Sequence, residues 1–366
     1  MKFTISRESL LPSLQVVNTV IERRQSLPVL SNLLVSLDKK AINLTGTDLE
    51  VELIVSIEQE NSETEEFTLS ARKLLDICRT LPEQANLEFS VEKDNVKISS
   101  EKSRFTLATI SAQEFPSSEM KATQIAFDLP QKVLKELMED TMFAMAQQDV
   151  RYYLNGLLLE VSNNKLKAVA TDGHRLALKE IDLALDTDQA TQIIIPRKGV
   201  TELSRILNSE ESAAHIQISQ NHIRVTIPQL QFTSKLIDGR FPDYDRVIPI
   251  QSEQKIIADR EKLRQSLNRA SILSNEKYRG IGVILQKGKI KAHAHNPEQE
   301  EAEEEIEVEY DGDEMEIGFN VSYLLDALDT IKTDKVILTI KDPNSSCLLL
   351  PDGDTHCKYV VMPMRL

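Results

Sequence analysis

Residues 169–178 read VATDGHRLAL and bring an acid, an imidazole and a guanidinium close together, at Asp172, His174 and Arg175. Histidine titrates near neutral pH and a carboxylate can orient its ring, so the trio could do acid–base chemistry on a phosphate or acyl group. The same letters fit a tight turn, because Gly173 tolerates a positive φ and an aspartate can accept hydrogen bonds from its own turn. The elements around the trio have to decide between these readings.

Three series of segments recur along the chain at intervals of about 125 residues, which indicates tandem copies of one fold. LSARKLLDICRTL, IPRKGVTELSRIL and FNVSYLLDALDTI each pass from a short apolar strand into an amphipathic helix. FTISRESLLPSLQVV, FDLPQKVLKELMEDTMFAM and IADREKLRQSLNRASIL do the same. The third series is NLTGTDLEVEL, KAVATDGHRLAL and KAHAHNPEQEEAEEEI, so the opening trio is one copy of three.

The repeat weakens the catalytic reading of the trio. In the first copy the letters T-D-L at 47–49 stand near the positions of D-G-H at 172–174, and in the third copy N-P stands at 296–297. A catalytic constellation would not be so generic. We therefore predict a structural turn between two strands, with His174 and Arg175 exposed beyond it.

The fold class follows from the segments between the helices. Stretches such as ANLEFSVEKDNVKISS and HIQISQNHIRVTI alternate apolar and polar residues, which predicts antiparallel strands joined by short turns. Each repeat of about 122 residues then holds two helices and about eight strands. The sequence predicts an α+β chain of three similar domains, each with two helices on antiparallel sheets, spanning 1–122, 123–250 and 251–366.

Composition excludes several classes of protein. The start, MKFTISRESLLPSL, lacks the apolar core of a signal peptide, and no apolar run reaches the roughly 20 residues of a membrane span, so we expect a cytoplasmic protein. Cys78, Cys347 and Cys357 have no Cys-x-x-Cys spacing, which favours reduced, structural cysteines over disulfides or a zinc site. The acidic run has no Asp-x-Asp-x-Asp-Gly loop for calcium. We expect neither a metal nor a cofactor.

The helices carry the positive charge of an acidic chain. The net charge of −15 argues against nucleic acid as a partner. The expected helices are nevertheless net positive in sum; they span 7–20, 71–81, 131–145, 197–207, 260–273 and 321–333. Basic residues seven apart, and so on one helix face, occur at Arg72 and Arg79, Lys198 and Arg205, and Lys262 and Arg269. Ordinary solvated faces are one reading, and a shared surface for a polyanion is the other.

Segments spread from end to end resemble the beta-subunit family of bacterial DNA polymerase III, the sliding clamps. They are LTGTDLE (44–50), ARK (71–73), QDVRYYLNG (148–156), ATDGHRLA (170–177), IPRKGV (195–200), FTSKLIDGRFPDY (232–244), LSNEKYRG (273–280), HNPEQEEAEE (295–304), MEIGFNVSY (315–323) and YVVMPMRL (359–366). The resemblance implies a non-enzymatic processivity factor. It also implies a head-to-tail dimer closed into a six-domain ring, with helices inside and sheets outside.

Simple geometry favours two chains over one. Six helices spaced about 10 Å apart would close a ring with a bore of only about 9 Å, too narrow for a duplex roughly 20 Å across. Twelve helices give a bore of about 28 Å by the same reasoning. Such a bore would contact phosphates loosely, which suits sliding without base readout.

The resemblance also implies which residues bind. The DNA-facing set is Arg24, Arg72, Lys73, Arg79, Gln148, Tyr152, Tyr153, Arg197, Lys198, Arg205 and Arg269. The two tyrosines could stack on bases, although core packing is equally open to them. A partner-peptide groove maps to Leu154, Thr171, Gly173, His174, Arg175, Leu176, Pro242, Arg246, Val247, Ser346, Val360, Met362, Pro363, Met364 and Arg365.

Two features of this groove come from the residues themselves. YVVMPMRL aligns with the strand copies FTLATI and FTSKLI, so 359–361 should be a strand that presents the following methionines. Apolar peptide side chains would then bury against Met362 and Leu176. Two residues depart from the family pattern. Asn344 stands where an apolar residue is expected, and Asp245 stands where a basic one is common.

The implied dimer contact joins the first domain of one chain to the third domain of another. Its residues are Lys73, Phe105, Ile272, Leu273, Glu298, Glu301 and Glu304. The implied partners are duplex DNA, a second copy of the chain, the polymerase III catalytic subunit, the clamp loader, other polymerases, and mismatch-repair and ligase factors that bind through short peptides. No membrane is among them.

Two other classes of function remain open at this point. A phosphohydrolase could use Asp172, His174 and the acidic run, but the chain has no Gly-rich phosphate loop and the trio sits in a repeated turn. A monomeric three-domain scaffold that binds only protein is the other class, and native mass would separate it from a ring.

Overall fold

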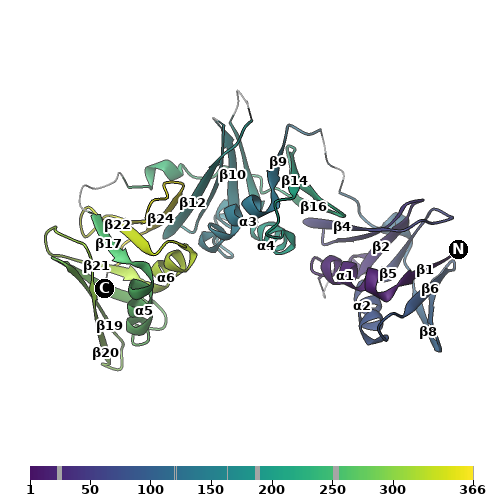
Figure 1. The fold of residues 1–366 in the computed structure, drawn as a ribbon, viewed down its shortest axis with the longest axis horizontal. Coiled ribbons are helices and arrows are strands. Elements are labelled where there is room, and N and C mark those ends of the chain that lie inside the picture. Colours follow the sequence, from purple (N-terminus) through teal and green to yellow (C-terminus); the bar gives the residue numbers. More distant parts are fainter. Residues whose placement is uncertain are drawn as a thin grey trace. The chain divides into compact units, whose positions relative to one another are not determined.

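The structure, a computed structural model, describes residues 1–22, 27–118, 120, 122–162, 164–185, 190–249 and 255–365. These residues contain two helices for each of the three expected repeats, as predicted. They are α1 (Arg7–Val17), α2 (Ala71–Thr80), α3 (Gln131–Glu139), α4 (Arg197–Ile206), α5 (Arg260–Ser271) and α6 (Val321–Thr330) (Figure 1). The third helix is shorter than the predicted range 131–145, because Met142–Ala144 forms a separate 3₁₀ turn.

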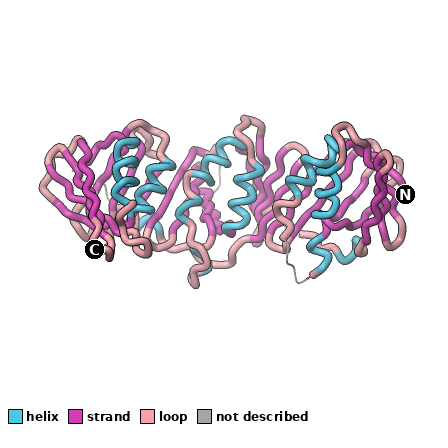
Figure 2. The backbone as a smooth tube through the Cα atoms, turned by 90° about the horizontal axis from the view of Figure 1, so that it is seen from below, coloured by secondary structure: helices cyan, strands magenta, loops and turns pink. Residues whose placement is uncertain are grey.

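Each helix begins directly after a strand, where a polar residue can end the strand and cap the helix. Ser6, Asp259 and Asn320 accept a hydrogen bond from the backbone N–H two or three residues further on. The apolar stripe predicted on α2 faces inward, since Leu74 and Cys78 are buried. Helices α1 and α2 pack side by side, and so do α5 and α6 (Figure 2).

The strands form four antiparallel sheets. The first is ordered β1 (Lys2–Ser6), β6 (Asn86–Val91), β7 (Asn95–Ser100) and β8 (Ser103–Ala108). The second is ordered β5 (Glu65–Ser70), β2 (Asn32–Leu37), β3 (Ala41–Thr47), β4 (Val51–Glu58), β16 (Leu230–Lys235), β15 (His222–Ile227), β14 (Ala213–Ile218) and β9 (Ile125–Pro130).

The other two sheets repeat this plan. One is ordered β13 (Thr191–Pro196), β10 (Gly156–Ser162), β11 (Lys165–Thr171), β12 (Arg175–Asp182), β24 (Cys357–Val361), β23 (Cys347–Pro351), β22 (Lys335–Thr339) and β17 (Lys255–Asp259). The last is ordered β20 (Glu301–Glu307), β19 (Lys289–His295), β18 (Gly280–Gln286) and β21 (Met315–Asn320).

Both eight-stranded sheets join one repeat to the next. Strand β4 pairs with β16, and β12 pairs with β24. The chain accordingly divides into two compact units that cut across the repeats, residues 1–135 with 198–236 and residues 136–197 with 237–366. Strands β8 and β20 stand at the ends of the four-stranded sheets and pair on one side only among the described residues.

The three cysteines are buried and free, as the sequence predicts. Burial raises the pKa of the Cys78 thiol to about 12, so it stays protonated and unreactive at neutral pH. No helix in the described part of the chain is long and apolar enough to cross a membrane.

One buried hydroxyl in the first unit makes three hydrogen bonds. Thr68 on β5 is fully buried, and its hydroxyl donates to the carbonyl of Ile110 at 2.7 Å. The same oxygen accepts from the Ile110 N–H and from the Asn32 amide, each at 3.0 Å. One hydroxyl thus holds the segment after β8 against β5.

Replacing Thr68 tests this anchor. Thr68→Val keeps the side-chain shape but leaves the Ile110 N–H and carbonyl without partners, so we expect a loss of about 2 kcal/mol in the free energy of unfolding. Thr68→Ser keeps the hydroxyl and should lose only about 1 kcal/mol, the value of one methyl group. Urea unfolding of both variants is the measurement, and equal losses would contradict the anchor.

Candidate functional site

The Asp172 trio lies in the turn between β11 and β12, as predicted. The Asp172 Oδ1 accepts from the backbone N–H groups of His174 at 2.9 Å and Arg175 at 3.0 Å, and Gly173 has φ +88°. The carboxylate is therefore committed to the turn and does not orient the imidazole. This geometry supports the structural reading over the catalytic one.

The first repeat contains the same turn in a register one residue away from the predicted one. Asp48 Oδ1 accepts from the N–H groups of Glu50 and Val51, and Leu49 takes the glycine position with φ +79°. Asp48, not Thr47, is therefore the counterpart of Asp172.

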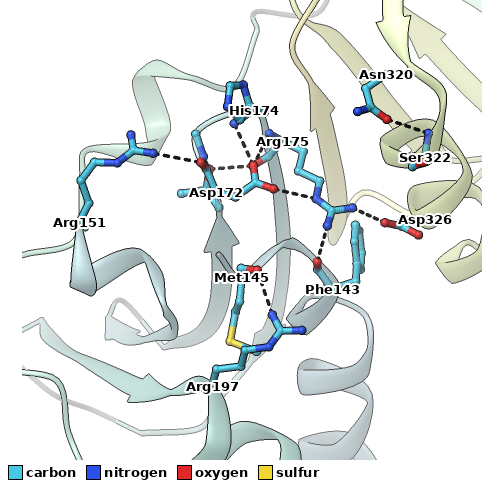
Figure 3. A network of polar contacts seen from close by, with 12 residues as sticks. Phe143, Met145, Arg151, Asp172, His174, Arg175, Arg197, Asn320, Ser322 and Asp326 are labelled. Carbon is cyan, nitrogen blue, oxygen red and sulfur yellow. Dashed lines mark hydrogen bonds and ion pairs between the residues drawn. The ribbon is translucent and has the colours of Figure 1, made fainter. Parts of the chain in front are cut away.

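Arg175 is not exposed, which corrects the sequence prediction. Its side chain is 13% exposed, and it donates to Asp172 Oδ2 at 3.1 Å, to the Phe143 carbonyl at 2.8 Å and to Asp326 on α6 (Figure 3). Its guanidinium also lies over the rings of Phe143 and Tyr323, 5.4 and 4.6 Å from their centroids. Arg175 thus ties the turn to α6 and has little capacity left for a ligand.

His174 is exposed, as predicted, and stacks on Tyr323 with ring centroids 6.4 Å apart. Burial raises the pKa of the Tyr323 hydroxyl, and the negative charge of Asp172 adds to this effect. A cavity of about 410 Å³ adjoins these rings. It is lined by Phe143, Met145, Ala146, Gln147, Asp149, Asp172, His174, Arg175, Arg197 and Tyr323.

The C-terminal segment is anchored as predicted, and beyond the strand as well. Strand β24 includes 359–361, the Met362 N–H donates to the His174 carbonyl at 2.9 Å, and the Met364 N–H donates to the Gly318 carbonyl at 2.8 Å. The Ser346 hydroxyl lies 3.0 Å from the Met362 sulfur. The turn and the terminus are therefore held together by backbone bonds.

The apolar part of the expected groove is already covered. Leu176 is 2% exposed and Val360 is fully buried, within a cluster that includes Phe241 and Tyr244 and that Val247 flanks. Leu154 and Thr171 are also buried. In this structure Leu176 therefore offers a peptide little exposed area, and the groove stays a prediction.

The outer members of the groove set lie elsewhere in the same unit. Pro242, Arg246 and Arg365 are exposed, and Arg246 pairs with Asp243 at 2.7 Å. Pro363 is half-buried. A second cavity, of about 430 Å³, is lined by Asn275, Tyr278, Gly280, His295, Asn296, Pro297, Met364 and Arg365.

The two departures from the family pattern lie on the surface. Asn344 is exposed and its N–H donates to Asp342 at 2.9 Å. Asp245 is exposed within the 3₁₀ turn Tyr244–Arg246. Neither side chain takes space from the apolar cluster.

The basic face of α2 is present as predicted. Arg72, Lys73 and Arg79 are exposed, and Arg72 makes only a 3.7 Å surface contact with Asp76. Arg24 lies outside the described residues.

The basic residues of α4 are more occupied than predicted. Lys198 bridges Glu22 and the buried carboxylate of Asp48. Burial disfavours its charge, but these hydrogen bonds outweigh burial and raise the pKa of Lys198. Arg197 donates to the Met145 carbonyl at 3.0 Å, and Arg205 pairs with Glu202 at 2.9 Å.

Arg269 on α5 is paired as well. Its guanidinium donates to both oxygens of Glu304 on β20, at 2.8 and 2.6 Å. Arg269, expected on a DNA surface, and Glu304, expected at a dimer contact, thus bind each other within the chain.

The segment 147–153 contains three further residues of the expected DNA set. Gln148 is exposed and has φ +55°. Tyr152 is 57% exposed, which is compatible with stacking on bases. Tyr153 is half-buried against the apolar cluster, which fits core packing. Arg151 holds the pKa of Asp149 down to about 2 through a hydrogen bond.

The expected dimer-contact residues occur in both units. Ile272 is 73% exposed just after α5, and Leu273 is half-buried. Phe105 is half-buried on the edge strand β8. Glu298 precedes β20 and Glu301 is its first residue, and both are exposed. No group of three metal-binding side chains occurs within the ranges that the structure describes.

Four residues that organise this region were missed in the sequence: Phe143, Asn320, Tyr323 and Asp326. Asn320 and Tyr323 lie in the segment MEIGFNVSY, which carries part of the family resemblance. Asp326 is three residues further along α6, on the face of Tyr323, and helical spacing from Tyr323 would have found it.

Comparison with known proteins gives one consistent result. Models of the DNA polymerase III beta subunit match in three parts: the N-terminal domain at 1–119, the central domain at 128–243 and the C-terminal domain at 245–365. A beta sliding clamp of Pseudomonas putida is 52% identical over 367 residues and covers all of both chains.

Solved structures agree. A DNA polymerase sliding clamp of Pseudomonas aeruginosa, crystallised with a ligand, is 49% identical and superposes with a TM-score of 0.98 over the whole of both chains. A sliding clamp of the same organism bound to griselimycin is 50% identical with a TM-score of 0.97, again over both whole chains.

The network around Arg175 can be tested by stability. Arg175→Met strands the partners of the guanidinium, so we expect a loss of about 3 kcal/mol in the free energy of unfolding. Arg246→Met, at an exposed arginine with one surface pair, should cost less than about 1 kcal/mol. Chemical unfolding of the two variants is the measurement. Similar small losses in the free energy of unfolding for both would contradict a stabilising role for the Arg175 network.

Proposed function

This chain belongs to the DNA polymerase III beta-subunit family, and we propose that it acts as a sliding clamp, a ring of two chains that encircles duplex DNA and tethers polymerases. It is then an accessory protein without catalytic residues. We take 1–122, 123–250 and 251–366 as its three clamp domains, and the cytoplasm as its location.

The strand pairing inside the chain is the observation that carries the ring. In the order of strands within the sheets, β4, β12 and β20 occupy equivalent positions, and so do β8, β16 and β24. Within the chain β4 pairs with β16, and β12 pairs with β24. By the same rule, β20 should pair with a strand equivalent to β8. We propose that this strand is the β8 of a second chain.

Such pairing is head-to-tail and must close to avoid a filament. Two chains supply twelve helices, and the bore estimated above for twelve helices passes a duplex. Unpaired strand edges also favour closure, because an edge with free N–H and carbonyl groups invites pairing.

The side chains at these edges support the same contact. Ile272 is exposed although it is apolar, and Phe105 on β8 is only half-buried. Lys73 would face Glu298 and Glu301, which are exposed and carry the opposite charge. We assign Leu273 to the apolar part of the contact. We leave Glu304 out of the contact because it pairs with Arg269 within the chain.

For DNA we assign the main role to the exposed basic and aromatic residues. These are Arg72, Lys73, Arg79, Gln148 and Tyr152, with Arg24 as a further member. Lys198, Arg205 and Arg269 are paired within the chain, and Arg197 is half-buried, so their contribution to phosphate binding should be smaller.

For protein partners we assign the surface around the turn at 171–176 and the C-terminal segment. The partners are the polymerase III catalytic subunit, the clamp loader, other polymerases, and mismatch-repair and ligase factors. Each would bind through a short peptide with a glutamine and a leucine–phenylalanine pair. Because Leu176 and Val360 are covered within a cluster that includes Phe241 and Tyr244, the segment 241–247 has to move when such a peptide enters.

Topological retention tests the proposed function. The protein should be loaded by its clamp loader with ATP on nicked circular DNA, and the DNA then linearised. We expect retention on the circles and rapid loss from linear ends, because a ring is held by topology and only weakly by charge. Equal retention on both forms would overturn the proposal.

A second test addresses the dimer contact. Ile272→Ala with Leu273→Ala removes apolar surface that is felt at both contacts of a two-chain ring, so we expect a folded monomer. Native mass at low micromolar concentration is the measurement, with circular dichroism as the control for folding. A folded variant that keeps the dimer mass would contradict the assigned contact.

A further inference from the structure

The apolar row beneath the proposed groove has a counterpart in the first compact unit. In the second unit, strand register aligns Thr171, Leu176, Val360 and Leu348 in one row across the sheet. In the first unit, the same register aligns Thr47, Glu52, Thr233 and Arg224. The two rows lie on equivalent strands but differ in chemistry.

The row in the first unit binds the chain's own backbone. Glu52 is 5% exposed, and its carboxylate accepts from the Ser118 N–H at 3.0 Å. Arg224 donates to the Ser118 carbonyl at 3.4 Å and to the Thr233 hydroxyl at 3.1 Å. Burial raises the pKa of Glu52, while the Ser118 N–H and the charge of Arg224 oppose this shift.

The segments that lie over the two rows are also related. FPSS at 115–118 matches FPDY at 241–244, and both phenylalanines are buried. In the second unit Tyr244 is fixed by its side chain, whose hydroxyl donates to Glu160 at 3.2 Å. In the first unit Ser118 at the matching position is fixed by both of its backbone groups.

We propose that Glu52, Arg224 and Thr233 are specificity-determining residues that close the first row to partner peptides, so that each chain offers one groove and not two. This inference rests on the proposed function, since it concerns the same peptides. The first row is a polar site filled by Ser118, and the second row is an apolar site that takes leucine and phenylalanine side chains once its cover moves.

The cost of desolvation explains why the polar row excludes such peptides. An apolar side chain entering the first row would displace Ser118 and leave a carboxylate and a guanidinium buried without their partners. The same side chain in the second row enters an apolar cluster that includes Leu176, Leu348 and Val360. The difference lies in three side chains on a shared backbone plan.

The test converts the first row into the second. The full-length variant Glu52→Leu, Thr233→Val and Arg224→Leu carries the apolar chemistry of the second row, and a synthetic glutamine and leucine–phenylalanine peptide is the probe. Isothermal titration should give one peptide per chain for the unaltered protein and two for the variant. Amide hydrogen exchange at Ser118 should become at least about tenfold faster, because its acceptor is lost.

Two controls make the result specific. Glu52→Gln keeps an oxygen acceptor and should keep one peptide per chain. Glu88→Leu with Ser99→Val adds apolar surface to the paired positions on β6 and β7, away from Ser118, and should also keep one.

The outcomes separate this inference from the proposed function. If the unaltered protein binds no peptide, the proposed groove fails and the inference fails with it. If the unaltered protein binds one peptide and the folded triple variant still binds one, the inference alone is overturned. Two peptides on the unaltered protein, or unchanged exchange at Ser118 in the variant, would also overturn it.

Discussion

The pairing of strand edges between repeats is the constraint on which the structure depends. A β-sheet leaves unpaired N–H and carbonyl groups at both of its edges, and each repeat contributes such edges. Inside the chain the edges of β4 and β12 are satisfied by β16 and β24 of the following repeat. This places the boundary between compact units inside the middle repeat, and in the proposed ring β8 and β20 are the edges that pair with another chain.

In each shared sheet, the turn between β3 and β4 or between β11 and β12 is held to a nearby helix by an ion pair, with opposite sign in the two units. In the first unit the acid of the turn, Asp48, binds Lys198 on α4. In the second unit the arginine of the turn, Arg175, binds Asp326 on α6. Both pairs are partly buried, so they fix the turn in position and withdraw basic residues from the surface.

Much of the fold could be predicted from the sequence, because its signals are local. Helical spacing after short strands gave six helices, and the Thr-Asp-Gly letters gave the turn at 171–174. The resemblance to a known family gave the function. Pairing between strands far apart in the chain, such as β12 with β24, was not predicted, because the alignment of YVVMPMRL with other strand copies gave only a strand at 359–361.

Side-chain environments were harder to predict, because they depend on partners distant in sequence. Lys198, Arg269 and Arg175 were expected on open surfaces, yet each is neutralised by an acid from another element. Leu176 was expected in an open groove, yet it is covered by residues more than sixty positions away. Spacing along one helix or strand does not show which distant side chain a residue will contact.

Amide hydrogen exchange at β8 and β20 tests the central claim most directly. In the unaltered protein at micromolar concentration, the amides of β8 and β20 that point away from β7 and β19 should be as protected as those that join β16 to β4 and β24 to β12. The intramolecular pairs serve as the internal reference in the same sample. Fast exchange at either edge, beside slow exchange at β16 and β24, would contradict the ring.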